Sequence, residues 1–156
     1  MDVERLLKDL VSTPSPSGEE RKVGEFLVKL LSKDFKIKKQ KVGNRFNILA
    51  YTGKPNIILS SHMDTVPNQL KVKEDGEFIY GRGSCDAKAS IASMICASEN
   101  LVKKGFTNFG LLFDVSEETD FEGIKKAVNL INPKTVIIGE PTNLKTFFGQ
   151  KGLLGI

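Results

Sequence analysis

The residues best suited to chemistry begin with the only histidine in the 156-residue chain, His62. It follows the apolar run at 57–59 and stands two positions before Asp64. An imidazole at the end of a buried strand, with an acid close behind it, suits a metal ligand whose ring a carboxylate orients. Taken alone, a His-x-Asp pair is more often structural than metal-binding.

Several acids strengthen the metal interpretation because each stands at the start of a helical pattern or just after an apolar strand pattern. They are Asp86, Glu117, Glu118 and Glu140. Buried carboxylates are unfavourable without a partner, and several that converge from strand ends are most easily neutralised by a bound cation. Zinc, cobalt or manganese would accept imidazole together with carboxylate oxygens.

Each acid also has a plainer interpretation. Asp86 could be the N-cap of the helix that follows it, since a negative charge is favourable at a helix N-terminus. Glu117 and Glu118 could be a solvated acid pair at a helix start. Cys85, beside Asp86, fits a small residue in a turn better than a ligand.

As a set, the motifs resemble those of the M20 metallopeptidase family. They are His62-x-Asp64, Gly81-x-Gly83-x-x-Asp86-x-Lys88, Glu117-Glu118-Thr119 and Gly139-Glu140-Pro141-Thr142. The motifs occur in the family's order, and the resemblance extends over about residues 1–155. It implies a hydrolase with two divalent metal ions, Zn²⁺ or Co²⁺.

The resemblance also implies a role for each residue of the metal site. His62 and Glu140 would bind one ion, Asp86 would bridge the two ions, and Glu118 would bind the second. A cis peptide bond is implied directly after Asp86.

Two further residues would act in catalysis by the same resemblance. Glu117 would be the general base that takes a proton from the attacking water and returns it to the leaving amine. Asp64 would orient and polarise His62 without touching the ion. Lys88 matches a family position but is assigned no catalytic role.

Family members continue beyond the segment that resembles 148–152 into a dimerisation (lid) domain, and then supply a last histidine ligand. We therefore expect residues 1–156 to be the N-terminal portion of the catalytic domain, with the lid domain and the last catalytic segment absent. One site, formed by His62, Asp86 and Glu140, would be complete. The second would keep only Asp86 and Glu118. The family's homodimer would lack its dimerisation domain here.

The expected reaction is metal-dependent hydrolysis of an N-acyl (amide) bond on an amino acid. The 139–142 motif resembles the deacylase branch of the family, which implies acylated lysine or ornithine in lysine or arginine biosynthesis. The substrate would be a small N-acyl amino acid or one linked to an acidic amino-group carrier protein. Two alternatives stay open: a dipeptidase or aminopeptidase, and a truncated, catalytically incomplete metal-binding fragment.

Composition fits one globular domain, with 40% hydrophobic residues and a net charge of +4. No apolar run approaches the ~20 residues of a membrane span, and the N-terminus lacks a secretory layout. We expect a cytoplasmic protein with reduced cysteines and no membrane partner. The lysines at 36–41 suit a solvated edge strand. Nucleic-acid binding is not expected, because no aromatic residue interleaves these lysines.

Hydrophobic periodicity and alternating elements predict an α/β fold, a three-layer mixed sheet with helices on both faces. The resemblance implies that this fold is zinc-exopeptidase-like and incomplete at the C-terminus. Strands are expected near 35–40, 46–51, 56–60, 108–115 and 134–139, antiparallel at first and parallel later. Helices are expected at 3–11, after Ser17 with apolar residues from Val23 to Leu31 on one face, from Asp86 until Gly105 ends it, and at 121–130. Asp2 should cap the first helix, and Ser17 with Glu20 should form a capping box for the second.

Overall fold

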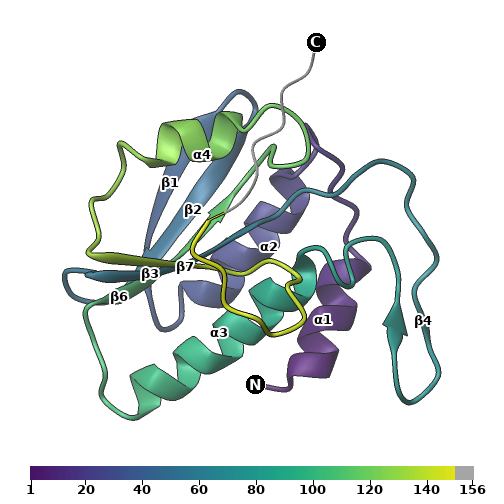
Figure 1. Cartoon of the computed structure of the whole chain (residues 1–156), viewed down its shortest axis with the longest axis horizontal. Helices are drawn as coiled ribbons and strands as arrows, with labels where there is room; N and C mark the ends of the chain where they lie inside the picture. The colour runs from purple at the N-terminus through teal and green to yellow at the C-terminus, as the bar shows by residue number, and fades with distance from the viewer. Residues whose placement is uncertain (150–156) are drawn as a thin grey trace.

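The computed structural model describes residues 1–149 and is built around one mixed β-sheet (Figure 1). Its strands are β1 (Lys36–Val42), β2 (Arg45–Tyr51), β3 (Ile57–His62), β6 (Phe109–Asp114) and β7 (Thr135–Ile138). They lie in the order β1-β2-β6-β3-β7. The pairs β1–β2 and β2–β6 are antiparallel, whereas β3 runs parallel to both β6 and β7.

The strand order corrects one expectation. The sequence suggested that the strands near 46–51 and 56–60 belong together in an antiparallel start to the sheet. Instead, β6 lies between β2 and β3. Strand β3 therefore has two parallel neighbours, which places its C-terminal end beside those of β6 and β7. The lysine-rich strand β1 is an edge strand, as predicted.

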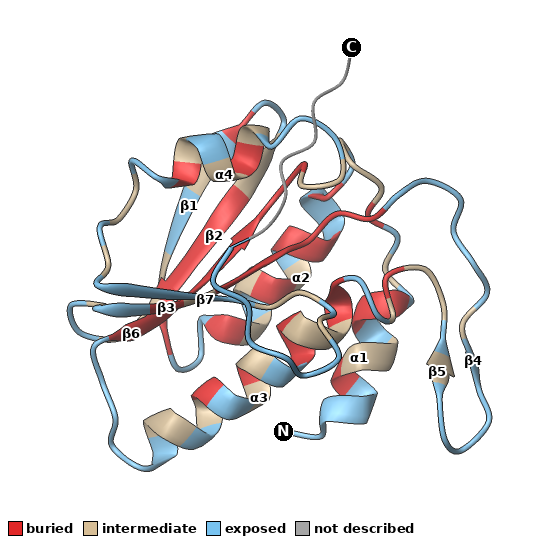
Figure 2. Ribbon diagram, viewed as in Figure 1, coloured by how far each residue is buried: buried red, intermediate tan, exposed pale blue. Residues whose placement is uncertain are grey.

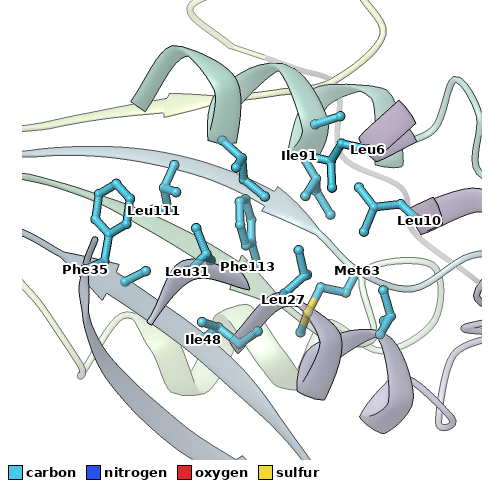
Figure 3. Packing of buried hydrophobic residues seen from close by; sticks show 14 of the residues in the cluster. Leu6, Leu10, Leu27, Leu31, Phe35, Ile48, Met63, Ile91, Leu111 and Phe113 are labelled. Carbon is cyan, nitrogen blue, oxygen red and sulfur yellow. The ribbon is translucent and has the colours of Figure 1, made fainter. Parts of the chain in front are cut away.

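Helices cover both faces of the sheet, which confirms the three-layer prediction (Figures 1 and 2). They are α1 (Val3–Val11), α2 (Arg21–Leu31), α3 (Lys88–Lys103) and α4 (Glu122–Ala127). Alternate residues of β6 face opposite ways, as strand geometry requires. Phe113 packs into a large core with α1, α2 and α3, which Figure 3 shows, whereas Leu112 packs with Ala127 of α4.

The helix starts test the capping predictions. Asp2 caps α1 as expected, because its Oδ1 accepts hydrogen bonds from the N–H groups of Glu4 and Arg5. The capping box at α2 is wrong: Glu20 is the N-cap residue but makes no side-chain cap bond. The alternative interpretation of Asp86 as an N-cap is also wrong, because Ala87 is the N-cap residue of α3.

A small hairpin that the sequence did not predict stands apart from the main sheet (Figure 1). Its strands are β4 (Lys73–Glu74) and β5 (Ile79–Tyr80). It is tied to α1 by the ion pair between Lys8 Nζ and Glu74 Oε2, 2.8 Å apart. Among the described residues, no helix combines the length and the apolar character needed to cross a membrane.

Candidate metal centre

The candidate acids gather where the parallel strands end. His62 is the last residue of β3 and pairs in register with Asp114, the last residue of β6. The turn with Glu117 and Glu118 directly follows β6, and Glu140 follows β7. Because β3, β6 and β7 are parallel, their carboxyl ends meet at one edge of the sheet, where open α/β sheets bind ligands.

His62 lies at the centre of this group and is only 1% exposed. Its Nε2 is 2.9 Å from Asp86 Oδ1 and 4.0 Å from both Glu117 Oε2 and Glu140 Oε1. On the other side of the ring, Nδ1 is 3.0 Å from the main-chain oxygen of Asp64. The ring therefore presents one nitrogen to the acids and has the other held by the backbone.

Two sets of side chains could each hold a cation. The first contains His62, Asp86 and Glu140, and the second contains His62, Glu117 and Glu118. Within each set, the candidate ligand atoms all lie within 4.8 Å of one another. The structure thus brings together all four residues predicted as metal ligands, and it adds Glu117 to the same cluster. Their roles as ligands remain predictions.

The electrostatics of the cluster favour an added positive charge. Burial raises the pKa of Glu140 to about 6, with His62 opposing that rise and the neighbouring acids adding to it. Burial likewise raises the pKa of Glu117 and of Glu118, and nearby carboxylates contribute. These raised pKa values mean that the ionised carboxylates repel one another and lack compensating positive charge. A bound divalent ion would supply that charge and stabilise the ionised forms.

His62 shows the opposite response to the same surroundings. Burial works against a charged ring, but hydrogen bonds with Asp64 and Asp86 outweigh it and raise the pKa of His62 to about 10. In the metal-free protein the protonated ring supplies part of the missing positive charge. The donor set, one imidazole among carboxylates, is the chemistry that zinc or cobalt accepts, so the residues present fit a divalent cation.

Asp64 lies fully buried behind this cluster. Its Oδ1 accepts the N–H of Glu117 at 3.0 Å, and its Oδ2 accepts the N–H of Glu118 at 3.0 Å and the Ser17 hydroxyl at 2.7 Å. Burial would raise the pKa of Asp64, but the bonds from His62, Ser17 and the two backbone N–H groups lower it. Asp64 is therefore a buried anion that organises both the ring and the acidic turn.

The segment that carries Asp86 has the backbone feature that the resemblance implied, since the Asp86–Ala87 peptide bond is cis. Lys88 follows and is 1% exposed, with Nζ donating to the main-chain oxygen of Thr13 at 2.8 Å. Burial lowers the pKa of Lys88 to about 8. Cys85 is exposed and belongs to neither candidate ligand set among residues 1–149, in keeping with its turn interpretation.

Sequence reasoning missed Asp114, which lies beside His62. It is 6% exposed, and its Oδ1 has no hydrogen-bond partner among the described residues. Burial raises the pKa of Asp114 to about 7, with His62 opposing the rise and the other acids adding to it. Its position at the end of an apolar strand, like that of His62, was the signal that could have singled it out.

Comparison with known proteins gives this cluster a family. The sequence model of peptidase family M20/M25/M40 matches residues 58–149, the part of the chain that holds all the candidate ligands. The chain belongs to this family. The resemblance found in the motifs is thereby confirmed.

Two curated relatives match almost all of the chain. A probable carboxypeptidase of Talaromyces marneffei is 42% identical over 184 residues, covering 96% of this chain and 41% of its own. A peptidase M20 domain-containing protein of Schizosaccharomyces pombe is 40% identical over 160 residues, covering 94% of this chain and 40% of its own. The chain thus spans about two fifths of the length of these relatives.

Solved structures of two peptidases, one of them described as an M20 family member, share the fold. A metallo-carboxypeptidase of Sulfolobus solfataricus has a TM-score of 0.74 at 21% identity, covering 89% of this chain and 37% of that one. A tripeptidase of Staphylococcus aureus has the same TM-score at 21% identity, covering 87% of this chain and 42% of that one. At this identity the likeness establishes the fold, and it confirms the predicted fold class.

Proposed function

We propose that this chain carries the metal centre of a hydrolase that cleaves a peptide or N-acyl amide bond. The supporting observation is the convergence of His62 with the acids at the ends of β3, β6 and β7. Membership of peptidase family M20/M25/M40 supports the same class of reaction. The relatives are longer than this chain, and the activity is proposed for the whole protein.

The metal would be held by the chain's own side chains as follows. His62, Asp86 and Glu140 would hold one ion, and Asp86 and Glu118 would contribute to a second. We favour Zn²⁺ or Co²⁺, because imidazole and carboxylate together suit these ions. When bound, such a cation supplies Lewis-acid chemistry, polarising the carbonyl and acidifying water.

Glu117 would move the proton in this proposal. Its side chain is partly exposed, and Oε2 lies 4.0 Å from His62 Nε2. Because burial raises its pKa, its carboxylate is a stronger base than an exposed glutamate. It would accept the proton of the attacking water and deliver it to the departing amine nitrogen. Asp64 would hold His62 and the turn in place throughout.

The names of the curated relatives favour a peptide substrate. Several are called probable carboxypeptidases, which supports cleavage beside a free carboxyl terminus. A dipeptidase would agree equally well, since a yeast dipeptidase shares the fold at TM-score 0.71. The deacylation of acyl-lysine or acyl-ornithine, on a carrier protein or free, remains a prediction without support from these relatives. The homodimer and the cytoplasmic location also remain predictions.

The test is an assay of the full-length protein after chelation and reloading with Zn²⁺ or Co²⁺. Peptides with a free carboxyl terminus, dipeptides and N-acetyl-ornithine would be compared. We expect metal-dependent hydrolysis of the peptides. Metal binding without turnover of any of these substrates would reject the proposed peptide or N-acyl hydrolase and leave a metal-binding protein without this activity.

A variant pair assigns the proton transfer. Glu117→Gln should keep metal binding and lower kcat by roughly 10²–10⁴-fold, the usual contribution of a general base. Glu19→Gln makes the same change at an exposed acid outside the cluster and should leave kcat unaltered. Equal kcat values for the two variants would remove Glu117 from the proposed mechanism.

A further inference from the structure

The backbone that carries Glu117 and Glu118 is held by side chains from elsewhere in the chain. Residues 115–118, here called the acidic turn, have four consecutive N–H groups, and each is accepted by a side-chain oxygen. The bonds run from Val115 to Asn47 Oδ1 (3.2 Å), Ser116 to Glu20 Oε1 (3.1 Å), Glu117 to Asp64 Oδ1 (3.0 Å) and Glu118 to Asp64 Oδ2 (3.0 Å). Neither strand nor helix bonding accounts for them.

The three acceptor residues are fully buried and come from separate segments. Asn47, Glu20 and Asp64 are each 0% exposed. A buried polar group is unfavourable unless it is hydrogen-bonded. The buried side-chain oxygens therefore depend on the N–H groups of the acidic turn, and these N–H groups depend on the oxygens. These bonds fix the position of the acidic turn relative to the sheet and to the segments that carry Asn47, Glu20 and Asp64.

Glu20 has a second link to the same turn. Its Oε2 lies 2.9 Å from Arg45 Nε, in a charge contact rather than a well-aligned hydrogen bond. Arg45 in turn donates from Nη2 to the Ser116 hydroxyl. Ser116 has φ of 63°, a left-handed conformation that a non-glycine residue keeps only when its surroundings impose it. Glu20 and Arg45 supply that restraint.

Ser17 links the loop between α1 and α2 to Asp64, which lies in the segment after β3. Its hydroxyl donates to Asp64 Oδ2 at 2.7 Å, on the same oxygen that accepts the Glu118 N–H. The loop around Ser17 is itself fixed, because Ser15 Oγ donates to the main-chain oxygen of Met63 at 2.8 Å. The loop between α1 and α2 thus fixes the orientation of the Asp64 carboxylate.

We propose that Glu20, Asn47 and Ser17 are positioning residues of the metal centre. They touch neither substrate nor ion, and they act by holding the acidic turn so that its two carboxylates face His62 before a cation arrives. A site organised in advance loses less conformational entropy on binding, and residues behind metal ligands commonly affect metal affinity. The inference rests on the proposed function, because it assumes that the cluster binds a metal.

The decisive variant is Ser17→Ala in the full-length protein. It removes one bond to Asp64 and leaves every candidate ligand in place. We expect Co²⁺ affinity, followed by visible absorption, to fall by about tenfold, as for other residues that orient ligands. Amide hydrogen exchange at 117 and 118 should accelerate in the metal-free protein, while exchange in the sheet core stays unaltered.

Two companion variants separate positioning from a general structural role. Ser17→Thr keeps a hydroxyl and should restore both affinity and protection. Ser32→Ala removes a serine bond at the end of α2, where Ser32 Oγ donates to the main-chain oxygen of Lys29, and should change neither quantity. Glu20→Ala is less informative by itself, because it leaves Arg45 without its buried partner and could unfold the domain.

The outcomes distinguish this proposal from the proposed function. If the unaltered protein binds Co²⁺ and Ser17→Ala binds it equally well with unaltered exchange, the positioning role is rejected and the metal centre stands. If Ser17→Ala and Ser32→Ala weaken binding equally, the effect is not positional and the proposal again fails. If the unaltered protein binds no Co²⁺, the positioning role and the proposed function are both overturned.

Discussion

Asp64 holds His62 chiefly through its main chain: the distance from His62 Nδ1 is 3.0 Å to the Asp64 main-chain oxygen and 3.5 Å to its carboxylate Oδ1. The Asp64 carboxylate is consequently free to accept the N–H groups of the acidic turn. One residue therefore couples the imidazole to the glutamates on the neighbouring strand end. This arrangement leads to the predictions below.

Replacing Asp64 by asparagine should damage the metal centre more than a simple loss of charge would. An amide has one acceptor oxygen, whereas the Asp64 carboxylate uses both oxygens to accept bonds from Ser17 and the turn. We expect Asp64→Asn to weaken Zn²⁺ binding by about 10–100-fold. The measurement is competition with a chelator of known affinity, and an affinity within twofold of the unaltered protein would contradict the expectation.

Metal affinity should rise with pH. The pKa of His62 is raised to about 10 in the metal-free protein, so between pH 6 and pH 8 the ring must lose its proton to become a ligand. One proton released per ion makes the Zn²⁺ affinity increase about tenfold per pH unit in this window. Calorimetry in buffers of different ionisation enthalpy would count the protons. An affinity that is flat over this range, with no proton released, would show that His62 is not a ligand.

The stability of the metal-free protein should fall as the pH rises from about 4 to about 7, because of Asp114. Its folded-state pKa is raised from 3.8 to about 7, so its contribution is fully present below about pH 4 and is lost as the pH rises toward 7. Asp114→Asn removes this titration. The stability difference between Asp114→Asn and the unaltered protein should therefore shift in favour of the variant by about 1–3 kcal/mol between pH 4 and pH 8. Urea unfolding at the two pH values measures it, and a pH-independent difference would contradict the assignment.

Gly123 should not tolerate a side chain, because α4 approaches the acidic turn at this residue. A Cβ there would lie 2.6 Å from Val115 N and 2.9 Å from Asn47 Oδ1, and closer still to the Val115 main-chain oxygen. We expect Gly123→Ala to lower the free energy of unfolding by about 1–3 kcal/mol and to weaken metal binding through the turn.

The matched control for this prediction is Gly149→Ala. A Cβ at Gly149 meets no atom within 4 Å, so that variant should change stability by less than about 0.5 kcal/mol. Thermal unfolding of both variants gives the comparison, and an equal Tm for Gly123→Ala and the unaltered protein would show that the turn can move.

Local sequence patterns predicted the elements because they depend on near neighbours. The apolar spacing of Leu6, Leu10 and Val11 reflects one buried face of α1. The apolar segment before Glu117 forms β6, and all of its residues are buried. The capping box at Ser17 and Glu20 failed because both side chains bind partners far along the chain, Asp64 in one case and Ser116 in the other. A short-range rule cannot anticipate such competition.

The candidate metal residues were accessible from the sequence for a related reason. Each of these acids, at an apolar strand end or a helix start, has a plainer interpretation by itself, but as an ordered set with His62 they match one family. Sequence reasoning assigned no role to Asp114 or Asn47, and only a capping role to Glu20. These side chains matter through hydrogen bonds and burial that link segments distant along the chain.

The sequence by itself determined the residue types at the strand ends, the helices and strands that carry them, and the family to which they belong. Only the tertiary structure decided that β6 lies between β2 and β3 and that Asp64, Glu20 and Asn47 hold the acidic turn. The physical reason is the sequence distance over which each kind of interaction acts. Periodicity and turn residues act over a few positions, whereas the partner of a buried carboxylate is chosen by whichever donor the packed sheet and helices bring within about 3 Å.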